Sequence, residues 1–384
     1  MKKKKNKSPS YIRVHKTRIY PTKDQESLLF KSIGVARYAY NWALHEWNTL
    51  YNNGGKPSAY ELRNDFVKLK EDPEYVWLKD VSKETYSNAI LNLGTAWGNY
   101  FKKTSKGKPK FKSKKSGKGS YTVMSSGTSN NLSWIDNHLY IPKFKKDNYL
   151  KIAEQPRWNG ELKQVTISYQ AGKWYASCMF SLEAPPVTLP RHKVKVEKVG
   201  IDLGVKTLAT FSDGIVATTI STKAIDKKIK KQQRKMSKKA KNSKNRLKAK
   251  TKLQALYLKK SNMLKDNLHK TTNFIVRRYK KICLETLKSS NMVKNHKLAR
   301  GIADAQFYEF KRQVEYKSKH LKERDVDITI LYADAFYPSS KTCSHCGNVK
   351  SKLSLSERTY NCTECGYVED RDLNAAKNLC KLIA

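Results

Sequence analysis

The sequence is poor in acidic residues: 33 Asp and Glu stand against 78 Lys and Arg in 384 residues, a formal net charge of +45. A surplus of this size destabilises a compact chain through self-repulsion unless a polyanion neutralises it. The sequence also lacks any run of about 18 apolar residues, and no apolar stretch follows the basic start at 1–7, so we expect neither a transmembrane helix nor a signal peptide. We therefore expect nucleic acid, and no membrane, as the polyanionic partner.

Cysteine is scarce as well, with seven residues in the chain. This number is too small for a secreted disulfide scaffold, and four of the cysteines are clustered near the C-terminus, so we expect a reducing, cytoplasmic compartment. Hydrophobic residues make up 39% of the chain, which is enough for a folded core and excludes a wholly disordered basic tail. The length favours two or three domains.

The clustered cysteines form two C-x₂-C pairs, Cys343 with Cys346 and Cys362 with Cys365, separated by 15 residues and each followed by glycine. Each pair suits a turn whose backbone amides orient two thiolates, and four thiolates complete a tetrahedral Zn²⁺ site with no open position. A closed site of this kind is structural. The sequence therefore predicts one structural Zn²⁺ that braces the C-terminal helix.

The first half of the chain alternates between strand-like and helical patterns. Residues 11–20 alternate as a strand, and Thr22 is placed to cap a helix whose apolar residues recur at three- and four-residue steps. We expect further helices at about 59–71 and 82–103, followed by short strands over 121–190 that include a hairpin of 165–169 with 174–180. These patterns predict a β-barrel that includes the strand at 11–20, with a helical domain inserted into it.

Two segments concentrate positive charge. Residues 104–120 are rich in Lys, Gly and Ser, whereas 223–281 combines 23 Lys or Arg and two acids with a thin apolar stripe typical of a long helix or helical hairpin. A solvated helix normally mixes both signs of charge, so we expect both segments to contact phosphates; a solvated linker is the alternative for 104–120. The candidate nucleic-acid-binding residues are Lys108, Lys110, Lys112, Lys114, Lys115, Arg234, Lys238, Lys239 and Arg246.

Three acids in the second half stand at the ends of predicted elements. Asp202 ends an apolar strand, Glu285 ends a second one, and Asp372 begins the terminal helix. We expect strands at 198–204, 207–212, 215–219, 281–285 and 327–333, and helices over 304–322 and from about 372 to 379. A strand hairpin followed by helix, strand, helix, strand and helix, with acids at these points, is the layout of a ribonuclease-H-like α/β domain. If the two strands are adjacent and parallel, Asp202 and Glu285 project from the same edge of the sheet.

Three carboxylates at one edge repel one another unless cations neutralise them. Hard oxygen ligands suit Mg²⁺ or Mn²⁺, and two such ions can hydrolyse a phosphodiester by activating a water and stabilising the leaving oxygen. Asp202, Glu285 and Asp372 are therefore the candidate catalytic residues and Mg²⁺ ligands. Asp370 is an alternative third ligand, and Asp304 is expected to be a helix N-cap.

Several stretches resemble motifs of the TnpB family, proteins encoded by bacterial insertion sequences and related to type V CRISPR effectors. In the second half these are G-I-D-L-G-V-K at 200–206, L-E at 284–285, F-Y-P-S-S-K-T-C at 336–343 and D-R-D-L-N-A-A at 370–376. The N-terminal matches are R-I-Y-P-T at 18–22, A-Y-N-W-A at 39–43 and G-K-P-K-F-K at 107–112. The resemblance spans nearly the whole chain and departs from no motif of the family.

The resemblance implies an RNA-guided DNA endonuclease that binds a noncoding guide RNA and cuts double-stranded target DNA next to a short transposon-adjacent motif. The family's catalytic residues fall on Asp202, Glu285 and Asp372 of a RuvC-type site. We expect a monomer in the RNA complex, located in the bacterial cytoplasm and on the nucleoid when bound to DNA. The implied multidomain α+β architecture is a wedge-like β-barrel (1–21 and 104–195), a helical recognition domain (22–103), a ribonuclease-H-like RuvC domain (196–342 and 367–384) and a zinc-binding insert (343–366).

Other functions stay open on sequence grounds. A nuclease-silent, RNA-guided DNA-binding repressor requires a lost acid, and none of the three is missing. A transposase, or an accessory protein in transposition, shares this fold, but the usual carboxylate order in transposases is Asp, Asp, Glu rather than Asp, Glu, Asp. A CRISPR-associated miniature effector differs by an adjacent repeat array.

Overall fold

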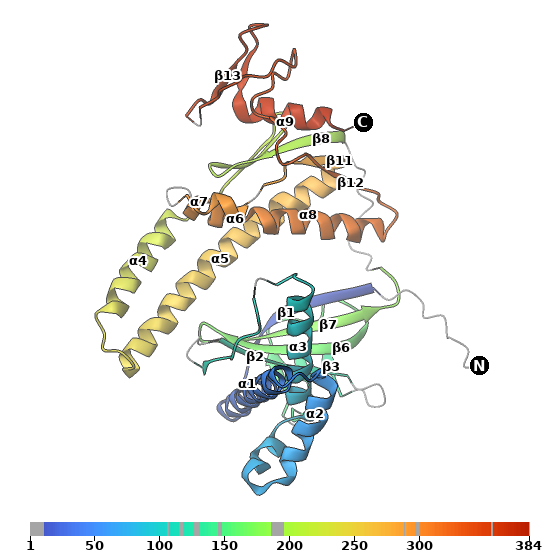
Figure 1. Cartoon of the computed structure of the whole chain (residues 1–384), viewed down its shortest axis with the longest axis vertical. Helices are drawn as coiled ribbons and strands as arrows, with labels where there is room; N and C mark the ends of the chain where they lie inside the picture. The colour runs from blue at the N-terminus through green and yellow to red at the C-terminus, as the bar shows by residue number, and fades with distance from the viewer. Residues whose placement is uncertain are drawn as a thin grey trace, which may run out of the picture. The chain divides into compact units, whose positions relative to one another are not determined.

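The computed structural model describes residues 11–105, 107–114, 118–125, 131–144, 148–185, 196–287, 289–295, 299–354 and 356–383. The basic start at 1–7 and the candidate nucleic-acid-binding residue Lys115 lie outside these residues. The chain forms two compact units, Met1–Pro186 and Val187–Ala384, and many of their helices and strands are labelled in Figure 1. Among the described residues, no helix is both long and apolar enough to cross a membrane.

The first unit begins with strand β1 (Tyr11–Tyr20) and the long helix α1 (Lys23–Asn52). Thr22 caps α1 as predicted: its hydroxyl accepts a hydrogen bond from Gln25 N at 3.3 Å, and Gln25 Oε1 accepts one from Thr22 N at 3.0 Å. The two predicted helices that follow are confirmed, with two 3₁₀ helices between them. Their bounds are α2 (Ala59–Lys68), η1 (Leu69–Glu71), η2 (Pro73–Asp80) and α3 (Lys83–Phe101).

The sheet of the first unit has seven antiparallel strands in the order β2-β6-β7-β1-β5-β4-β3. The strands after β1 are β2 (Lys118–Met124), β3 (Ser133–Ile135), β4 (His138–Tyr140), β5 (Leu150–Ile152), β6 (Glu161–Gln170) and β7 (Lys173–Leu182). β6 and β7 form the predicted hairpin, and Ala171 and Gly172 between them both have positive φ, as a tight primed turn requires. β1 joins this sheet beside β7.

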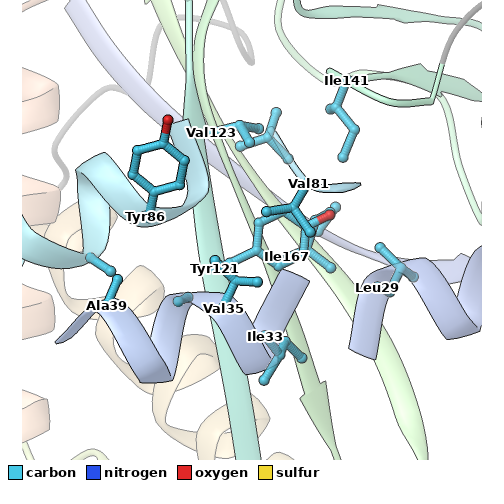
Figure 2. Close-up of a cluster of buried hydrophobic side chains, with 14 of the residues drawn as sticks. Leu29, Ile33, Val35, Ala39, Val81, Tyr86, Tyr121, Val123, Ile141 and Ile167 are labelled. Atoms are coloured by element: carbon cyan, nitrogen blue, oxygen red, sulfur yellow. The ribbon is translucent and has the colours of Figure 1, made fainter. Parts of the chain in front are cut away.

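One hydrophobic core connects the helices of the first unit to its sheet. Figure 2 shows part of this core: Ile33 of α1 and Tyr86 of α3 belong to the same buried cluster as Tyr121 of β2 and Ile167 of β6. In the part of the chain that the structure describes, β2 and β3 are the edge strands of the sheet and do not pair with each other. Closure into a barrel therefore stays a prediction.

The second unit is built on a five-stranded sheet in the order β10-β9-β8-β11-β12. Its strands are those predicted: β8 (Val196–Leu203), β9 (Thr207–Phe211), β10 (Val216–Thr218), β11 (Tyr279–Leu284) and β12 (Thr329–Tyr332). β8, β9 and β10 pair antiparallel, whereas β11 lies between β8 and β12 and pairs in parallel with both. Val199, Ile201, Ile282 and Leu284 are fully buried in the core around these central strands.

Most of the basic segment 223–281 is a helical hairpin of α4 (Lys223–Ser237) and α5 (Lys244–Arg278), and its last three residues begin β11. The later helices described in this unit are α6 (Ser289–Met292), α7 (Ala299–Ala305), α8 (Phe307–Lys322) and α9 (Arg371–Lys381). The helix predicted over 304–322 is interrupted at Gln306, whose φ is 53°. The prediction that Asp304 is an N-cap is wrong, because Asp304 lies within α7 and its carboxylate accepts a hydrogen bond from Lys260 Nζ at 2.7 Å.

Candidate active site and metal centre

Asp202 and Glu285 lie at the same edge of the five-stranded sheet. The parallel pairing of β8 and β11 sets Ile201 opposite Leu284, so the next residue of each segment emerges beside its neighbour. Glu285 Oε1 accepts a hydrogen bond from Leu203 N at 2.9 Å, which holds this carboxylate against β8. The structure thus brings together the two acids that the sequence placed at one edge.

Helix α9 brings Asp372 to this edge. The helix packs directly on β8 at Gly200, where an added Cβ would lie 2.1 Å from Ala376 O and 2.3 Å from Cys380 N, so a side chain here would displace the helix. Asp372 lies one helical turn before Ala376 on α9, and Asp202 lies two residues after Gly200 on β8. Each of these steps covers about 6 Å along its helix or strand. The matching steps direct Asp372 toward Asp202.

Burial and mutual repulsion raise the pKa of two of the acids at this edge, Asp202 and Glu285. Desolvation, followed by the charges of Glu285 and Asp372, raises the pKa of Asp202 well above its usual value. Desolvation raises the pKa of Glu285 to about 7, against the hydrogen bond from Leu203 and with a further contribution from Asp372. A bound cation would stabilise the charged form of all three groups.

The donor set of this edge fits a hard cation. Three carboxylates offer only oxygen ligands, which suit Mg²⁺ or Mn²⁺. Asp370, the alternative third ligand, is the N-cap of α9, and its Oδ1 accepts hydrogen bonds from Asp372 N and Leu373 N, both at 3.0 Å. One oxygen of Asp370 is thereby engaged by the helix start, which favours Asp372 as the third acid.

The four cysteines gather more tightly than the acids. Cys343 Sγ lies 3.8 Å from Cys365 Sγ, and Cys346 Sγ lies 3.6 Å from Cys362 Sγ. Four thiolates around Zn²⁺, with Zn–S bonds of about 2.3 Å, would lie about 3.8 Å apart, so the cluster fits a tetrahedral zinc site. Within the described residues, this is the one group of three or more possible ligands whose atoms all lie within 4.8 Å of one another.

Two turns build the cysteine cluster. Each C-x₂-C pair is closed by a glycine at positive φ, 82° at Gly347 and 72° at Gly366. The second turn lies between the paired strands β13 (Thr359–Asn361) and β14 (Val368–Asp370). Backbone N–H groups in that turn, above all that of Cys365, lower the pKa of Cys362, which favours the thiolate, the form of cysteine that can bind a metal ion.

Four candidate nucleic-acid-binding residues lie exposed in the segment 107–114: Lys108, Lys110, Lys112 and Lys114. Asn41 of α1 fixes this segment, because its side-chain amide donates to Lys112 O at 3.0 Å and accepts from Lys112 N at 2.8 Å. The Lys112 ammonium lies 3.6 Å from the centre of the Tyr40 ring, and desolvation lowers the pKa of Lys112. Lys112 therefore already has a structural contact, and the other three lysines are better placed to reach phosphates.

Another four candidates surround the turn between α4 and α5: Arg234, Lys238, Lys239 and Arg246. Arg246 Nη1 donates to Met236 O at 3.0 Å and to Lys239 O at 2.8 Å, so this side chain closes the helical hairpin. Arg234, Lys238 and Lys239 are exposed. Binding of nucleic acid by these residues stays a prediction.

Sequence reasoning missed an ion-pair network that joins α4, α5 and α7. Lys260 Nζ lies 3.0 Å from Asp226 Oδ1 and 2.7 Å from Asp304 Oδ2, and Arg300 pairs with Asp226. The network holds the basic hairpin to α7, which in turn packs on Val205 just after Asp202. The sequence did contain one indication of this network: Asp226 is one of only two acids in 223–281, a segment that holds 23 Lys or Arg.

Comparison with known proteins places this architecture in a family. Family models match residues 179–296 ("Probable transposase"), 307–379 ("Cas12f1-like, TNB domain") and 11–56 ("Helix-turn-helix domain"). A relative from Streptomyces pristinaespiralis, named "Putative RNA-guided DNA endonuclease", is 33% identical over 96% of this chain and 88% of its own length. The chain belongs to the TnpB family. The resemblance seen in the sequence motifs is thereby confirmed.

Further similarities to TnpB-family proteins and related structures extend over nearly the whole chain. A relative from Escherichia coli K12, named "Putative RNA-guided DNA endonuclease InsQ", is 29% identical over 96% of this chain and 91% of its own length. A Cas12f1 chain, solved by cryo-EM with single-guide RNA and target DNA, matches with a TM-score of 0.55 at 13% identity, covering 97% of this chain and 99% of its own. At that identity the match shows the mixed α/β fold alone. The helix-turn-helix description does not fit 11–56, which hold one strand and one long helix.

Proposed function

We propose that this TnpB-family chain is an RNA-guided DNA endonuclease that cuts double-stranded target DNA at a metal-dependent, RuvC-type site. The observation that carries the proposal is the placement of Asp202, Glu285 and Asp372 at one sheet edge, where burial and repulsion raise the pKa of the first two. The two relatives described above are named for the same activity. Three antiparallel strands followed by two parallel ones support a ribonuclease-H-like domain over 196–342 and 367–384, with 343–366 as a zinc-binding insert.

Asp202, Glu285 and Asp372 would hold two Mg²⁺ or Mn²⁺ ions. Divalent ions bound there would supply an activated water and charge stabilisation for the departing 3′ oxygen of a phosphodiester. The chain itself contributes placement: the Leu203 N–H holds one oxygen of Glu285 and leaves the other for a ligand role. The packing of α9 on Gly200 sets the position of Asp372 along β8. The cysteine cluster would hold one structural Zn²⁺ and no substrate.

The partners in this proposal are a noncoding guide RNA and a double-stranded DNA target next to a short transposon-adjacent motif. The seven-stranded sheet and the helices α1 to α3 support a wedge-like barrel domain (1–21 and 104–195) with an inserted recognition domain (22–103). The net charge of +45 matches the many phosphates of a guide RNA and its target duplex. The exposed lysines of 107–114 and of the α4–α5 turn would contact those phosphates, in a complex with one copy of the protein.

The proposal is tested with protein purified together with the RNA expressed from its native locus. Asp202→Ala and Glu285→Ala should bring specific cleavage below detection and leave RNA and target binding close to wild type, because these acids would hold ions and not nucleic acid. Asp266→Ala is the matched control, since Asp266 is an exposed acid paired with Lys270 one turn away. Undiminished cleavage by either active-site variant, or specific cleavage by RNase-treated protein, would overturn the proposal.

The description "Probable transposase" for 179–296 supports a second candidate, a protein that joins DNA ends. The same preparations separate the two candidates. Asp202-dependent joined products, without guide-dependent breaks, would favour the transposase. Guide-dependent binding by wild-type protein that never cuts would favour the nuclease-silent repressor instead.

A further inference from the structure

One side of helix α9 carries a stripe of polar side chains that face the loop 339–344, which leads into the first cysteine pair. Asn374, Asn378 and Lys381 recur at four- and three-residue steps, so they lie on one side of the helix. All three donate or accept hydrogen bonds with the backbone of 339–344. Neither the zinc ligands nor the three acids require asparagine at positions 374 and 378, so this stripe calls for its own explanation.

Asn374 binds the backbone on both sides of Cys343. Its Oδ1 accepts from Ser344 N at 2.8 Å, and its Nδ2 donates to Thr342 O at 2.8 Å. The side chain is fully buried. Because one partner is a backbone donor and the other a backbone acceptor, only an amide satisfies both, and an aspartate would set a carboxylate oxygen against Thr342 O.

Asn378 fastens the same loop one turn further along α9. Its Nδ2 donates to Ser339 O at 2.9 Å and to Thr342 O at 2.6 Å, and only 1% of the residue is exposed. Lys381 Nζ adds a more exposed bond to Ser344 O at 2.6 Å. Loss of one partner of a buried hydrogen bond leaves the other group unsatisfied, which makes such pairs costly to break.

The opposite side of α9 faces the catalytic edge. Asp372 and Ala376 are one turn apart and share a side, whereas Asn374 points about 200° around the helix from Asp372. Ala376 lies on Gly200 of β8. The helix is therefore held between the backbone of β8 and the backbone around Cys343, with the carboxylate on one side and the two asparagines on the other.

We propose that Asn374 and Asn378 are positioning residues that couple the zinc site to Asp372. This inference rests on the proposed nuclease function for its effect on cleavage, though not for its effect on zinc. The two amides fix the rotation of α9 to the first cysteine turn, and zinc in turn fixes that turn. A rotation of about 10° moves a carboxylate that lies about 6 Å from the helix axis by about 1 Å. A displacement of about 1 Å at a catalytic group can lower the rate about 100-fold.

The first test is zinc release, which needs no cleavage. Wild type, Asn374→Ala, Asn378→Ala and Lys381→Ala are purified as RNA complexes, and zinc transfer to a chromogenic chelator is followed in time. Both asparagine variants should release zinc about 10-fold faster or more, the usual size of an effect from groups that support metal ligands. Lys381→Ala, which loses one exposed bond, should stay close to wild type. Wild-type release rates in both asparagine variants would overturn the coupling.

The second test measures how much Mg²⁺ cleavage requires. A displaced Asp372 should raise the Mg²⁺ concentration for half-maximal cleavage in Asn374→Ala and Asn378→Ala, with target binding unchanged. Partial removal of zinc from wild type should shift the requirement in the same direction. The same treatment should add little in the double asparagine variant, because the link is already broken. An unchanged Mg²⁺ requirement in all variants would overturn the proposal.

A ranking of substitutions separates positioning by hydrogen bonds from simple filling of space. Asn378→Asp keeps the shape of the side chain but sets a carboxylate against Ser339 O and Thr342 O, so it should release zinc faster than Asn378→Ala. A space-filling role requires the reverse order. If wild type proves inactive as a nuclease, the proposed function fails, while zinc release and this ranking still decide whether the asparagines brace the zinc site.

Discussion

The two candidate metal sites of the second unit are assembled in opposite ways. The four cysteines come from two short turns, and each pair is complete within four residues of sequence. The three acids are separated from one another by more than 80 residues and meet only because β11 pairs with β8 and α9 packs on Gly200. Local backbone geometry therefore places the thiolates, whereas long-range packing places the carboxylates.

This difference also appears in how closely the ligand atoms approach one another. The four Sγ atoms all lie within 4.8 Å of one another, and the acids do not reach that spacing within the described residues. Helix α9 belongs to both sites, since Asp370 at its cap ends β14 of the cysteine hairpin and Asp372 follows two residues later. A change in one site can therefore reach the other through a single helix.

The largest effect is expected from removal of a zinc ligand. Cys362→Ser should abolish stoichiometric zinc and expose 343–366 to limited proteolysis, because structural zinc sites contribute about 10–16 kcal/mol of apparent binding free energy. His345→Ala is the control: His345 lies between two cysteines and stacks on Tyr367 at 5.5 Å, outside the thiolate cluster. The measurements are zinc per protein by elemental analysis and the sites of first proteolytic cleavage.

A Cys362→Ser protein that retains one zinc per chain would contradict the assignment of the four cysteines. Zinc loss in His345→Ala would show that the histidine takes part in the site. Either result would weaken the contrast between a cluster built by local turns and an edge built by packing.

A smaller but selective effect is expected at Gly200. Gly200→Ala sets a Cβ about 2 Å from backbone atoms of α9, and overpacking of this kind typically lowers the free energy of unfolding by about 1–3 kcal/mol. We expect cleavage to fall sharply and zinc content to stay at one per chain, because all four thiolates are retained and the coupling through α9 changes the rate of zinc release rather than the number of zinc ions bound. Thermal unfolding, zinc content and cleavage rate report these effects separately.

Gly98→Ala is the matched control for this substitution. Gly98 lies within α3, and no atom comes within 4 Å of an added Cβ. Alanine there should raise the free energy of unfolding by about 0.5–1 kcal/mol, because glycine weakens a helix interior. Wild-type cleavage by Gly200→Ala would show that the contact of α9 with β8 does not set the position of Asp372.

The parts of the structure that follow local rules were accessible from the sequence. The β6–β7 hairpin, the Thr22 cap and the C-x₂-C turns depend on residues within a few positions of one another, and the structure has all of them. The three acids were predicted to lie at one sheet edge because the order of strands and helices along the chain strongly restricts where each strand ends. In each case the sequence pattern alone determines where the residues lie.

Features that depend on distant partners were not accessible. The residues around Asp304 resemble the start of a helix in the sequence. In the structure its carboxylate instead accepts a hydrogen bond from Lys260, 44 residues earlier, and helix α8 begins after Gln306. Asn374 and Asn378 read as ordinary helix residues, because their partners are backbone atoms that any sequence supplies. Burial of an amide becomes visible only when the packing is known.

The smallest predicted effect concerns Asp370, where the two modes of assembly meet. As the N-cap of α9, Asp370 should be replaceable by Asn, which also caps helices well, whereas Asp370→Ala should lower the free energy of unfolding by about 1 kcal/mol. Cleavage by Asp370→Asn should stay near wild type, while Asp372→Asn should lose it. Paired thermal unfolding and cleavage assays of these three variants show whether Asp370 acts as a helix cap or as a metal ligand. If Asp370→Asn keeps its stability and loses cleavage, Asp370 acts as a metal ligand, and the catalytic edge extends into the cysteine hairpin.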